Sequence, residues 1–379
     1  MRTEAAVLWE TDGPWDVREV ELGEPVAGEV LVRLAASGIC HTDDHLVTGG
    51  LPQPLPAIGG HEGAGVVEAV GPGVTDVAPG DPVVLIYIPS CGRCRPCAQG
   101  RQNLCERGAH RREGRALADG TLRFSTDGTA AGGLTTMCLL GTFARHTVVH
   151  ETQVLKVEGD IPLVPAALVG CGVTAGVGAA LHGAEVRAGD VVAVVGVGGL
   201  GAAAIQGARI AGARIVVAVE PVRGKHATAL AMGATHVAAD LEQARALLEE
   251  LSWGRMANAA ILTTDLARGE DLGPTMELLG KNGRAAVVAV APPDQRRADL
   301  SLLDLTLYEK QVRGTLYGSR SPRAAIPELL DLYRAGRLVL DEMVTTRYRL
   351  GEINRGFADL RAATNVRGLI VYDDDGGPG

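Results

Sequence analysis

The sequence lacks the features that would direct a protein to nucleic acid, to a membrane surface or out of the cell. It has no basic stripe, and its 45 acidic residues outnumber its 36 lysines and arginines, for a formal charge of -9. Nucleic acid and anionic membranes select clustered Lys and Arg, so neither is an expected partner. No apolar core with a small-residue cleavage site follows Met1, which argues against a signal peptide and predicts a cytoplasmic location.

Long uncharged runs are also scarce. Residues 161–181 carry no charge over a length that would suit a transmembrane helix. Two prolines and four glycines lie within this run, and they lower its hydrophobicity and interrupt a helix. Burial inside the protein is therefore the favoured interpretation.

The length of 379 residues exceeds what one hydrophobic core usually supports, and predicts two domains. Up to about residue 160, short segments rich in Val, Ile and Leu alternate with Gly, Pro and Asp, which indicates a β-rich, barrel-like domain. We expect this domain over 1–170, a dinucleotide-binding domain over 171–317, and a return to the first domain over 318–379. The last seven residues, with three aspartates and then Gly-Gly-Pro-Gly, predict a disordered end.

Seven cysteines, an odd number with four tightly clustered, indicate metal binding rather than disulfides. The cluster is Cys91-x2-Cys94-x2-Cys97-x7-Cys105. Four thiolates at this spacing can enclose one tetrahedral zinc ion and leave no open position, so a structural zinc that holds a loop is favoured. Four free thiols or an iron-sulfur cluster are the alternatives.

A second candidate metal site lies between Cys40 and Glu62. A catalytic zinc takes three protein ligands and leaves one position open. Cys40 and His61 can supply two of them, and Cys171 is the remaining cysteine that suits the third position. The alternative for Cys171 is a small buried thiol between two glycines. Cys138 has no matching partner and is interpreted as such a packed thiol.

A dinucleotide-binding motif follows in the second half of the chain. The apolar run Val191–Val195 predicts a buried parallel strand. After it come Gly196, Gly198, Gly199, Leu200 and Gly201, then a helix pattern to Gly212, and a strand that ends in Glu220, nineteen positions beyond Gly201. These glycines let a pyrophosphate approach a helix N-terminus, and the carboxylate accepts hydrogen bonds from ribose hydroxyls. Glu220 favours NAD over NADP, although Arg223 and Lys225 lie close to it in the sequence.

Further strands and helices alternate after Glu220 and predict a doubly wound parallel sheet. Strand patterns cover 236–239, 257–262 and 283–290, and helix patterns cover 241–251 and 271–279. A helix over 323–335 and a strand over 368–372 are expected to return to the first domain. The polar stretch 103–140 is long enough to form a lobe over a pocket, with a mobile surface loop as the alternative.

The two cysteine-containing sets ahead of a GxGxxG motif resemble the zinc-dependent medium-chain alcohol dehydrogenases over nearly the whole chain. Shorter stretches, 6–10, 89–94, 137–143 and 305–310, are similar to the actinobacterial nitrosoaniline-dependent branch. Members of that branch are nicotinoproteins, which hold NAD(H) tightly and recycle it with an external electron acceptor. The resemblance implies a GroES-like catalytic domain, a Rossmann domain, two zinc ions and NAD(H), an alcohol or aldehyde substrate, and a homodimer or homotetramer.

The resemblance also implies roles for the residues that match the family's motifs. Cys40, His61 and Cys171 match the catalytic zinc ligands, and Thr42 matches the hydroxyl that contacts the zinc-bound alcohol. His45 matches the end of a proton relay, and its ordinary pKa of about 6.5 suits proton release. The other matches are Asp43, which orients the zinc histidine, Glu62 behind the metal, His41 and Arg367 at the pyrophosphate, and Lys225 at the adenosine ribose.

Some positions depart from the family pattern. Ala175 stands where a threonine usually packs near the nicotinamide. Asp265 replaces a usual glycine and Asn258 a usual aspartate, on the strand and loop expected to border the nucleotide. Asp44 is interpreted as a solvated or loop-capping acid. Ala175 and Asp265 motivate an alternative reading, a catalytically altered zinc- and NAD-binding protein with a redox-sensing or structural role.

Overall fold

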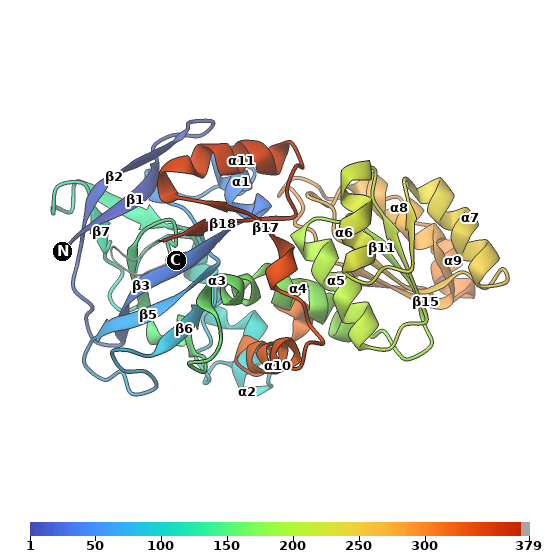
Figure 1. The fold of residues 1–379 in the computed structure, drawn as a ribbon, viewed down its shortest axis with the longest axis horizontal. Coiled ribbons are helices and arrows are strands. Elements are labelled where there is room, and N and C mark those ends of the chain that lie inside the picture. The colour runs from blue at the N-terminus through green and yellow to red at the C-terminus, as the bar shows by residue number, and fades with distance from the viewer. Residues whose placement is uncertain (373–379) are drawn as a thin grey trace. The chain divides into compact units, whose positions relative to one another are not determined.

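The computed structural model describes residues 1–372 and contains two compact units (Figure 1). The first unit comprises Met1–Cys171, Ser321–Leu330 and the chain from Leu340 onward. The second comprises Gly172–Arg320 and Asp331–Val339. Each unit has its own hydrophobic core, as a chain of this length requires. The predicted disordered end, 373–379, lies outside the described residues.

A closed barrel forms one part of the first unit. Its strands, in spatial order, are β1 (Arg2–Leu8), β2 (Trp15–Leu22), β7 (Phe124–Ser125), β8 (Gly133–Thr136) and β4 (Ala57–Ile58). Side chains of β1 alternate between two cores: Ala5 and Val7 pack in one, and Ala6 and Leu8 in the other. The first strand is therefore buried on both faces.

A second sheet of the first unit is built around β3 (Glu29–Ile39). Its other strands are β10 (Val154–Lys156), β6 (Pro82–Leu85), β5 (Gly63–Val70), β18 (Arg367–Val371) and β17 (Val344–Tyr348), with β9 (His146–His150) also paired to β3. The red strand β18 lies beside the blue strand β3 in Figure 1, antiparallel to it. The chain therefore does return to its first domain, and the predicted barrel-like character of that domain is confirmed.

Short helices connect these strands. They are α1 (His41–Val47), α2 (Arg95–Ala98), α3 (Leu163–Ala166) and α11 (Ile353–Arg361), with η1 (Gln102–Leu104), η2 (Glu106–Arg112), η3 (Met137–Leu139), η4 (Glu151–Gln153), η5 (Ala167–Gly170), η9 (Asp341–Met343) and η10 (Leu350–Glu352). Helix α10 (Pro322–Arg334) has residues in both units. The stretch 103–140 is neither a separate lobe nor a plain loop, because β7 and β8 within it complete the barrel.

The second unit is a parallel sheet with helices between its strands, as predicted. The strand order is β13 (His236–Ala238), β12 (Ile215–Val219), β11 (Val191–Val195), β14 (Ala257–Leu262), β15 (Leu279–Val287) and β16 (Gln311–Gly314). The helices are α4 (Gly172–Gly178), η6 (Ala179–Gly183), α5 (Gly199–Ile210), η7 (Arg223–Lys225), α6 (His226–Ala231), α7 (Leu241–Leu251), α8 (Gly269–Glu277), α9 (Leu302–Leu307) and η8 (Tyr317–Ser319). The strand order changes direction after β11, where doubly wound sheets bind ligands.

The uncharged run 161–181 forms α3, η5, α4 and the start of η6, and most of its side chains are buried. Within residues 1–372, no single helix is long and apolar enough to cross a membrane. Two shorter helical segments reach that length and apolar composition only when they are taken together: Leu163–Gly170 and Gly172–Gly183. The chain bends sharply between them.

Candidate functional site

Helix α1 and the turn before β5 bring a buried aspartate and a buried histidine together. Asp43 and His61 are 0% and 1% exposed. Asp43 Oδ1 accepts a hydrogen bond from the Gly60 N–H at 3.0 Å and lies 3.0 Å from His61 Nδ1, while Asp43 Oδ2 accepts from the Cys40 N–H at 3.2 Å. Because Nδ1 faces a carboxylate, Nδ1 carries the proton and Nε2 presents its lone pair.

That Nε2 atom is buried without a hydrogen-bond partner among residues 1–372. It belongs to a group in which one donor atom each from Cys40, His61 and Cys171 lie within 4.8 Å of one another. A buried nitrogen of this kind is costly unless something accepts its lone pair. Two sulfurs and one imidazole nitrogen, oriented by a carboxylate, form the donor set that zinc prefers.

The pKa values of Cys40, Cys171 and His61 are shifted because these side chains are buried close to one another. The hydrogen bond with Cys171 holds the pKa of the Cys40 thiol well below its usual value, while the same bond raises the pKa of Cys171 well above it. Burial works to lower the pKa of His61, but the Asp43 carboxylate outweighs it and the pKa is raised well above its usual value. A cation bound by this group would favour the ionised form of both sulfurs and the neutral form of His61, in which Nε2 carries a lone pair.

The residues predicted to assist this group lie next to it in the first unit. The Cys40 thiol donates to the Thr42 hydroxyl at 3.6 Å. Thr42 and His45 are three positions apart on α1, so their side chains lie on one face of the helix. Glu62 is fully buried and forms an ion pair with Arg367 of β18, so both charges are neutralised inside the protein.

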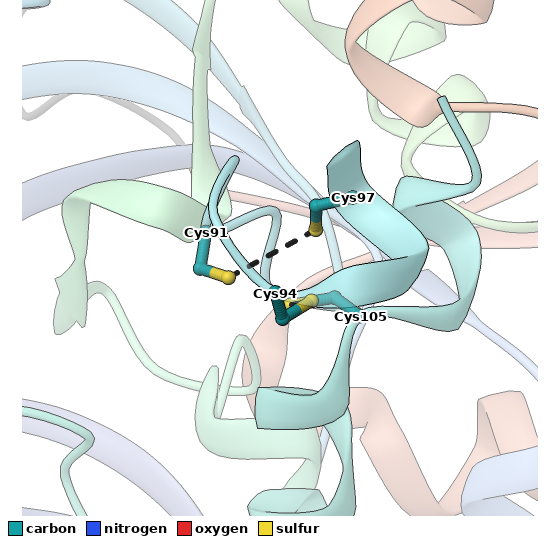
Figure 2. A group of neighbouring side chains, drawn as sticks. All are labelled: Cys91, Cys94, Cys97 and Cys105. Carbon is teal, nitrogen blue, oxygen red and sulfur yellow. Dashed lines mark hydrogen bonds between the residues drawn. The ribbon is translucent and has the colours of Figure 1, made fainter. Parts of the chain in front are cut away.

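The second cysteine group is also assembled, as Figure 2 shows. One sulfur each from Cys91, Cys94, Cys97 and Cys105 lie within 4.8 Å of one another. The Cys91–Cys97 and Cys94–Cys105 sulfurs are each 3.9 Å apart. Burial works to raise the pKa of Cys91, but backbone N–H groups of Arg93 and Cys94 lower it to about 6. Four converging sulfurs that already include one acidic thiol fit a closed tetrahedral zinc site.

In the second unit, the glycine motif forms the turn from β11 into α5. Gly196 has a φ of 96°, and a Cβ on Gly201 would lie 1.9 Å from the Gly196 carbonyl oxygen, so both positions require glycine. Gly198 precedes the helix as its N-cap, and Gly199 and Leu200 begin it. Glu220, which follows β12, accepts hydrogen bonds from the Val197 and Val222 N–H groups at 2.9 and 2.8 Å. The carboxylate is thereby held at the glycine turn.

The remaining residues that are predicted to contact NAD(H) belong to different units. Lys225 ends η7, five residues after Glu220, while His41 and Arg367 lie in the first unit. Ala175 is buried in α4, and Asp265 follows the carboxyl end of β14. Asn258 lies on β14, the strand beside β11, as expected, but it is the second residue of β14, and its Oδ1 accepts a hydrogen bond from Val191 N–H at the amino end of β11. It therefore lies at the opposite end of the sheet from the glycine turn.

The interpretation of Asp44 as a solvated acid is also wrong. Asp44 is 9% exposed, and its Oδ1 lies 2.6 Å from Arg361 Nη2 of α11. This pair joins helices that are far apart in the sequence, so no local pattern could reveal it. Sequence reasoning also missed Tyr87, whose ring packs edge-on against His61 with centroids 5.9 Å apart.

The β-rich unit with its Cys/His/Cys group and the parallel-sheet unit with its glycine turn define a zinc-binding dehydrogenase. Residues 26–159 match the alcohol dehydrogenase GroES-like domain, and residues 199–335 match the zinc-binding dehydrogenase domain. The chain belongs to the zinc-binding alcohol dehydrogenase family, and the resemblance seen in its motifs is confirmed.

Similar proteins cover both units. A putative alcohol dehydrogenase D of Mycobacterium tuberculosis is 48% identical over 98% of this chain and all of its own length. An NDMA-dependent alcohol dehydrogenase of Amycolatopsis methanolica is 46% identical over 99% of this chain and all of its own. The crystal structure of benzyl alcohol dehydrogenase from Acinetobacter calcoaceticus is 31% identical and covers 98% of this chain and all of its own, with a TM-score of 0.90. These similarities favour an enzyme over a redox-sensing or structural protein.

Proposed function

We propose that this enzyme transfers a hydride between a small alcohol or aldehyde and NAD(H) at the Cys40/His61/Cys171 group. The observation that carries the proposal is the buried, unpartnered His61 Nε2 facing two cysteine sulfurs, with Asp43 fixing the ring from the other side. A group of three protein ligands leaves the fourth position of a tetrahedral zinc ion to a substrate or water, as catalytic zinc sites do. The names of the similar proteins agree with this reaction.

Two zinc ions per chain are the proposed metal content. Cys40, His61 and Cys171 would hold the catalytic ion, and Cys91, Cys94, Cys97 and Cys105 the structural ion. Gly196, Gly198, Gly199, Leu200, Gly201, Glu220 and Lys225 would bind the adenosine half and the pyrophosphate of NAD(H), with His41 and Arg367 as further pyrophosphate contacts. The buried Glu220 carboxylate supports NAD, because a negative charge there disfavours the extra phosphate of NADP.

The chemistry divides between these groups and the side chains around them. When bound, zinc supplies Lewis acidity that lowers the pKa of a substrate hydroxyl, and the nicotinamide accepts the hydride. Thr42, beside Cys40, is placed to accept the hydroxyl proton, and His45 on the same face of α1 is placed to pass it on. Asp43 keeps His61 in the tautomer that leaves Nε2 free for the metal, and Glu62 offsets the charge of Arg367.

We also propose that NAD(H) is held tightly and is recycled by an external electron acceptor. Support comes from the similarity to an NDMA-dependent alcohol dehydrogenase over nearly the whole chain. Denaturing the purified protein would release one dinucleotide per chain. Alcohol oxidation by the undialysed protein would then require a dye acceptor rather than added NAD.

A homodimer or homotetramer is the proposed assembly. Within the second unit, α9 exposes Leu302, Leu303 and Leu307 at 66–74%, and β16 is an edge strand that follows it. Unpaired edge strands and exposed clusters of leucine are costly in a monomer and suit contact with a second copy.

The function is tested with the Cys40→Ala variant and a panel of primary alcohols. We expect the wild-type protein to oxidise alcohols with a dye acceptor present, and the variant to lose this activity while its far-ultraviolet circular dichroism stays unchanged. A folded Cys40→Ala protein with wild-type turnover would rule out the proposed site.

A further inference from the structure

A buried hydroxyl of the second unit contacts the glycine turn from a neighbouring strand. Thr263 directly follows β14 and is 5% exposed. Its Oγ1 donates to the Val195 carbonyl oxygen at 2.9 Å and to the Gly196 carbonyl oxygen at 2.8 Å, so one proton is shared between two consecutive acceptors. The Thr263 N–H also donates to the Val195 oxygen. Pairing of β11 with β14 explains the N–H contact, whereas the hydroxyl contact depends on the threonine side chain.

The Gly196 carbonyl oxygen is closely packed against the first turn of α5. A Cβ on Gly201 would lie 1.9 Å from this oxygen and 2.9 Å from Thr263 Oγ1. The absent side chain at Gly201 therefore leaves the space in which the carbonyl oxygen and the hydroxyl meet. Gly196 itself has a φ of 96°, a conformation that only glycine adopts at low cost, and glycine permits other backbone orientations just as readily. The turn needs a further contact to hold one orientation.

Two side chains hold the peptide group between Gly196 and Val197, one at each end. The Val197 N–H donates to Glu220 Oε2 at 2.9 Å, and the Gly196 carbonyl oxygen accepts from Thr263 Oγ1. Glu220 directly follows β12 and Thr263 directly follows β14, the two strands that flank β11. The carboxyl ends of three adjacent strands thus fix one peptide group, and that group cannot rotate unless both contacts break.

This peptide group leads into the part of α5 that suits an anion. The first N–H groups of a helix have no partner within the helix, and they attract a phosphate group. A Cβ on Gly198, the N-cap residue, meets nothing within 4 Å, so a ligand can approach the backbone there. Donors that are already oriented bind an anion more tightly, because binding does not have to order them.

We infer that Thr263 is a positioning residue for the dinucleotide. Its hydroxyl, opposite Glu220, fixes the Gly196–Val197 peptide group in the orientation that leaves the first N–H groups of α5 to the pyrophosphate. The inference rests on the proposed function and adds a residue that determines how firmly NAD(H) is held. Its effect should be specific to ligands that carry the pyrophosphate.

The test compares Thr263→Ala with Thr263→Ser, two variants that differ only by the hydroxyl. The zinc-loaded full-length protein, freed of dinucleotide, is titrated calorimetrically with ADP-ribose. Adenosine, which lacks the pyrophosphate, is measured by competition. We expect Thr263→Ala to bind ADP-ribose about ten-fold more weakly than the wild type, the effect of losing one buried hydrogen bond, and Thr263→Ser to stay within about two-fold. Adenosine should bind equally to all three proteins.

Thr235→Ala is the matched control. Thr235 Oγ1 donates to the Val216 carbonyl oxygen at 3.0 Å, a contact of the same kind near the amino end of β12. Its loss should lower the melting temperature and leave ADP-ribose binding unchanged. Thr263→Val, which fills the space of threonine but has no donor, should lose ADP-ribose affinity as Thr263→Ala does, and it provides the same test if the alanine variant does not fold.

The possible outcomes separate the inference from the proposed function. Wild-type affinity for ADP-ribose in a folded Thr263→Ala or Thr263→Val protein would overturn the inference and leave the proposed function standing. An equal loss for ADP-ribose and adenosine, or no recovery in Thr263→Ser, would also overturn it, because either result indicates a general structural role. A wild-type protein that binds neither ADP-ribose nor NADH would contradict the proposed function, and the inference with it.

Discussion

At the scale of single residues, the site depends on how Asp43 uses its two carboxylate oxygens. One oxygen contacts His61 Nδ1 and the Gly60 N–H, and the other accepts from the Cys40 N–H. Asp43 therefore positions two of the three proposed ligands through separate contacts. Burial raises the pKa of Asp43, and His61 opposes that shift. Asp43 does not face solvent, so its carboxylate serves to orient His61 and Cys40.

The first prediction concerns Asp43→Asn. The amide cannot orient His61 as a carboxylate does, so we expect the affinity for the catalytic zinc to fall about 10- to 100-fold. Competition with a chromogenic chelator measures this affinity. Asp44→Asn, on the same helix as Asp43, is the control: it breaks the ion pair with Arg361 of α11 and should lower stability without changing zinc affinity. Wild-type affinity in Asp43→Asn would show that Asp43 does not support the metal.

The second prediction concerns Gly38, which makes room for the buried Glu62–Arg367 pair. A Cβ at this position would lie 1.8 Å from Glu62 Oε2 and 2.9 Å from Arg367 Nη2. Gly38→Ala must separate two buried charges, which costs about 3 kcal/mol of stability. Urea unfolding measures the loss. Gly159→Ala, where a Cβ meets nothing within 4 Å, should change stability by less than about 0.5 kcal/mol.

At the scale of elements, the second unit was predictable because its signals are local. Val191–Val195, Ala257–Leu262 and Leu241–Leu251 have the predicted bounds, since apolar runs or a helical period end there at glycine, acid or turn residues. The barrel strands β7 and β8 were not predicted. They are two and four residues long, too short for an alternating pattern, and although they pair with each other, their other partners, β2 and β4, lie elsewhere in the chain.

The third prediction tests the glycine turn as a pyrophosphate site. A Cβ on Gly198 meets nothing within 4 Å, and its φ of -87° suits any residue. Gly198→Ala should therefore leave stability unchanged but place a methyl group where the pyrophosphate approaches the backbone, and weaken NADH binding by about ten-fold. Fluorescence titration of the dinucleotide-free protein measures this. Gly224→Ala, also uncrowded, should bind NADH normally; equal affinity in the Gly198 variant would exclude this binding mode.

At the scale of the whole molecule, the net charge of the chain does not show how its charges are distributed along the sequence. The net charge of -9 predicts no basic region, although the side chains of Lys, Arg, Asp and Glu in residues 91–115 sum to +5. The Cys171 partner of Cys40 was found because cysteine is rare in the chain and the family pattern is known. The Asp44–Arg361 pair was missed because both residue types are common and 317 positions separate them. A contact between residues far apart in the sequence is predictable only where few residues of the required chemical type are present.

The fourth prediction concerns assembly. Replacing Leu303 and Leu307 of α9 together with aspartate adds charge to the exposed leucine cluster and should convert an oligomer to monomer without unfolding it. Light scattering after size-exclusion chromatography gives the mass. Leu230→Asp on α6, where an exposed leucine stands outside this cluster, should leave the assembly intact. An unchanged mass in the double variant would place the contact elsewhere.

The most direct test of the central claim is the zinc content of the folded protein, measured by inductively coupled plasma mass spectrometry. We predict two zinc ions per chain in the wild type and in Cys138→Ala, whose buried thiol belongs to neither group. Cys171→Ala should retain the structural ion alone, one zinc per chain, and lose alcohol oxidation. A single zinc in the wild type, or two in a folded Cys171→Ala protein, would contradict the proposed catalytic site.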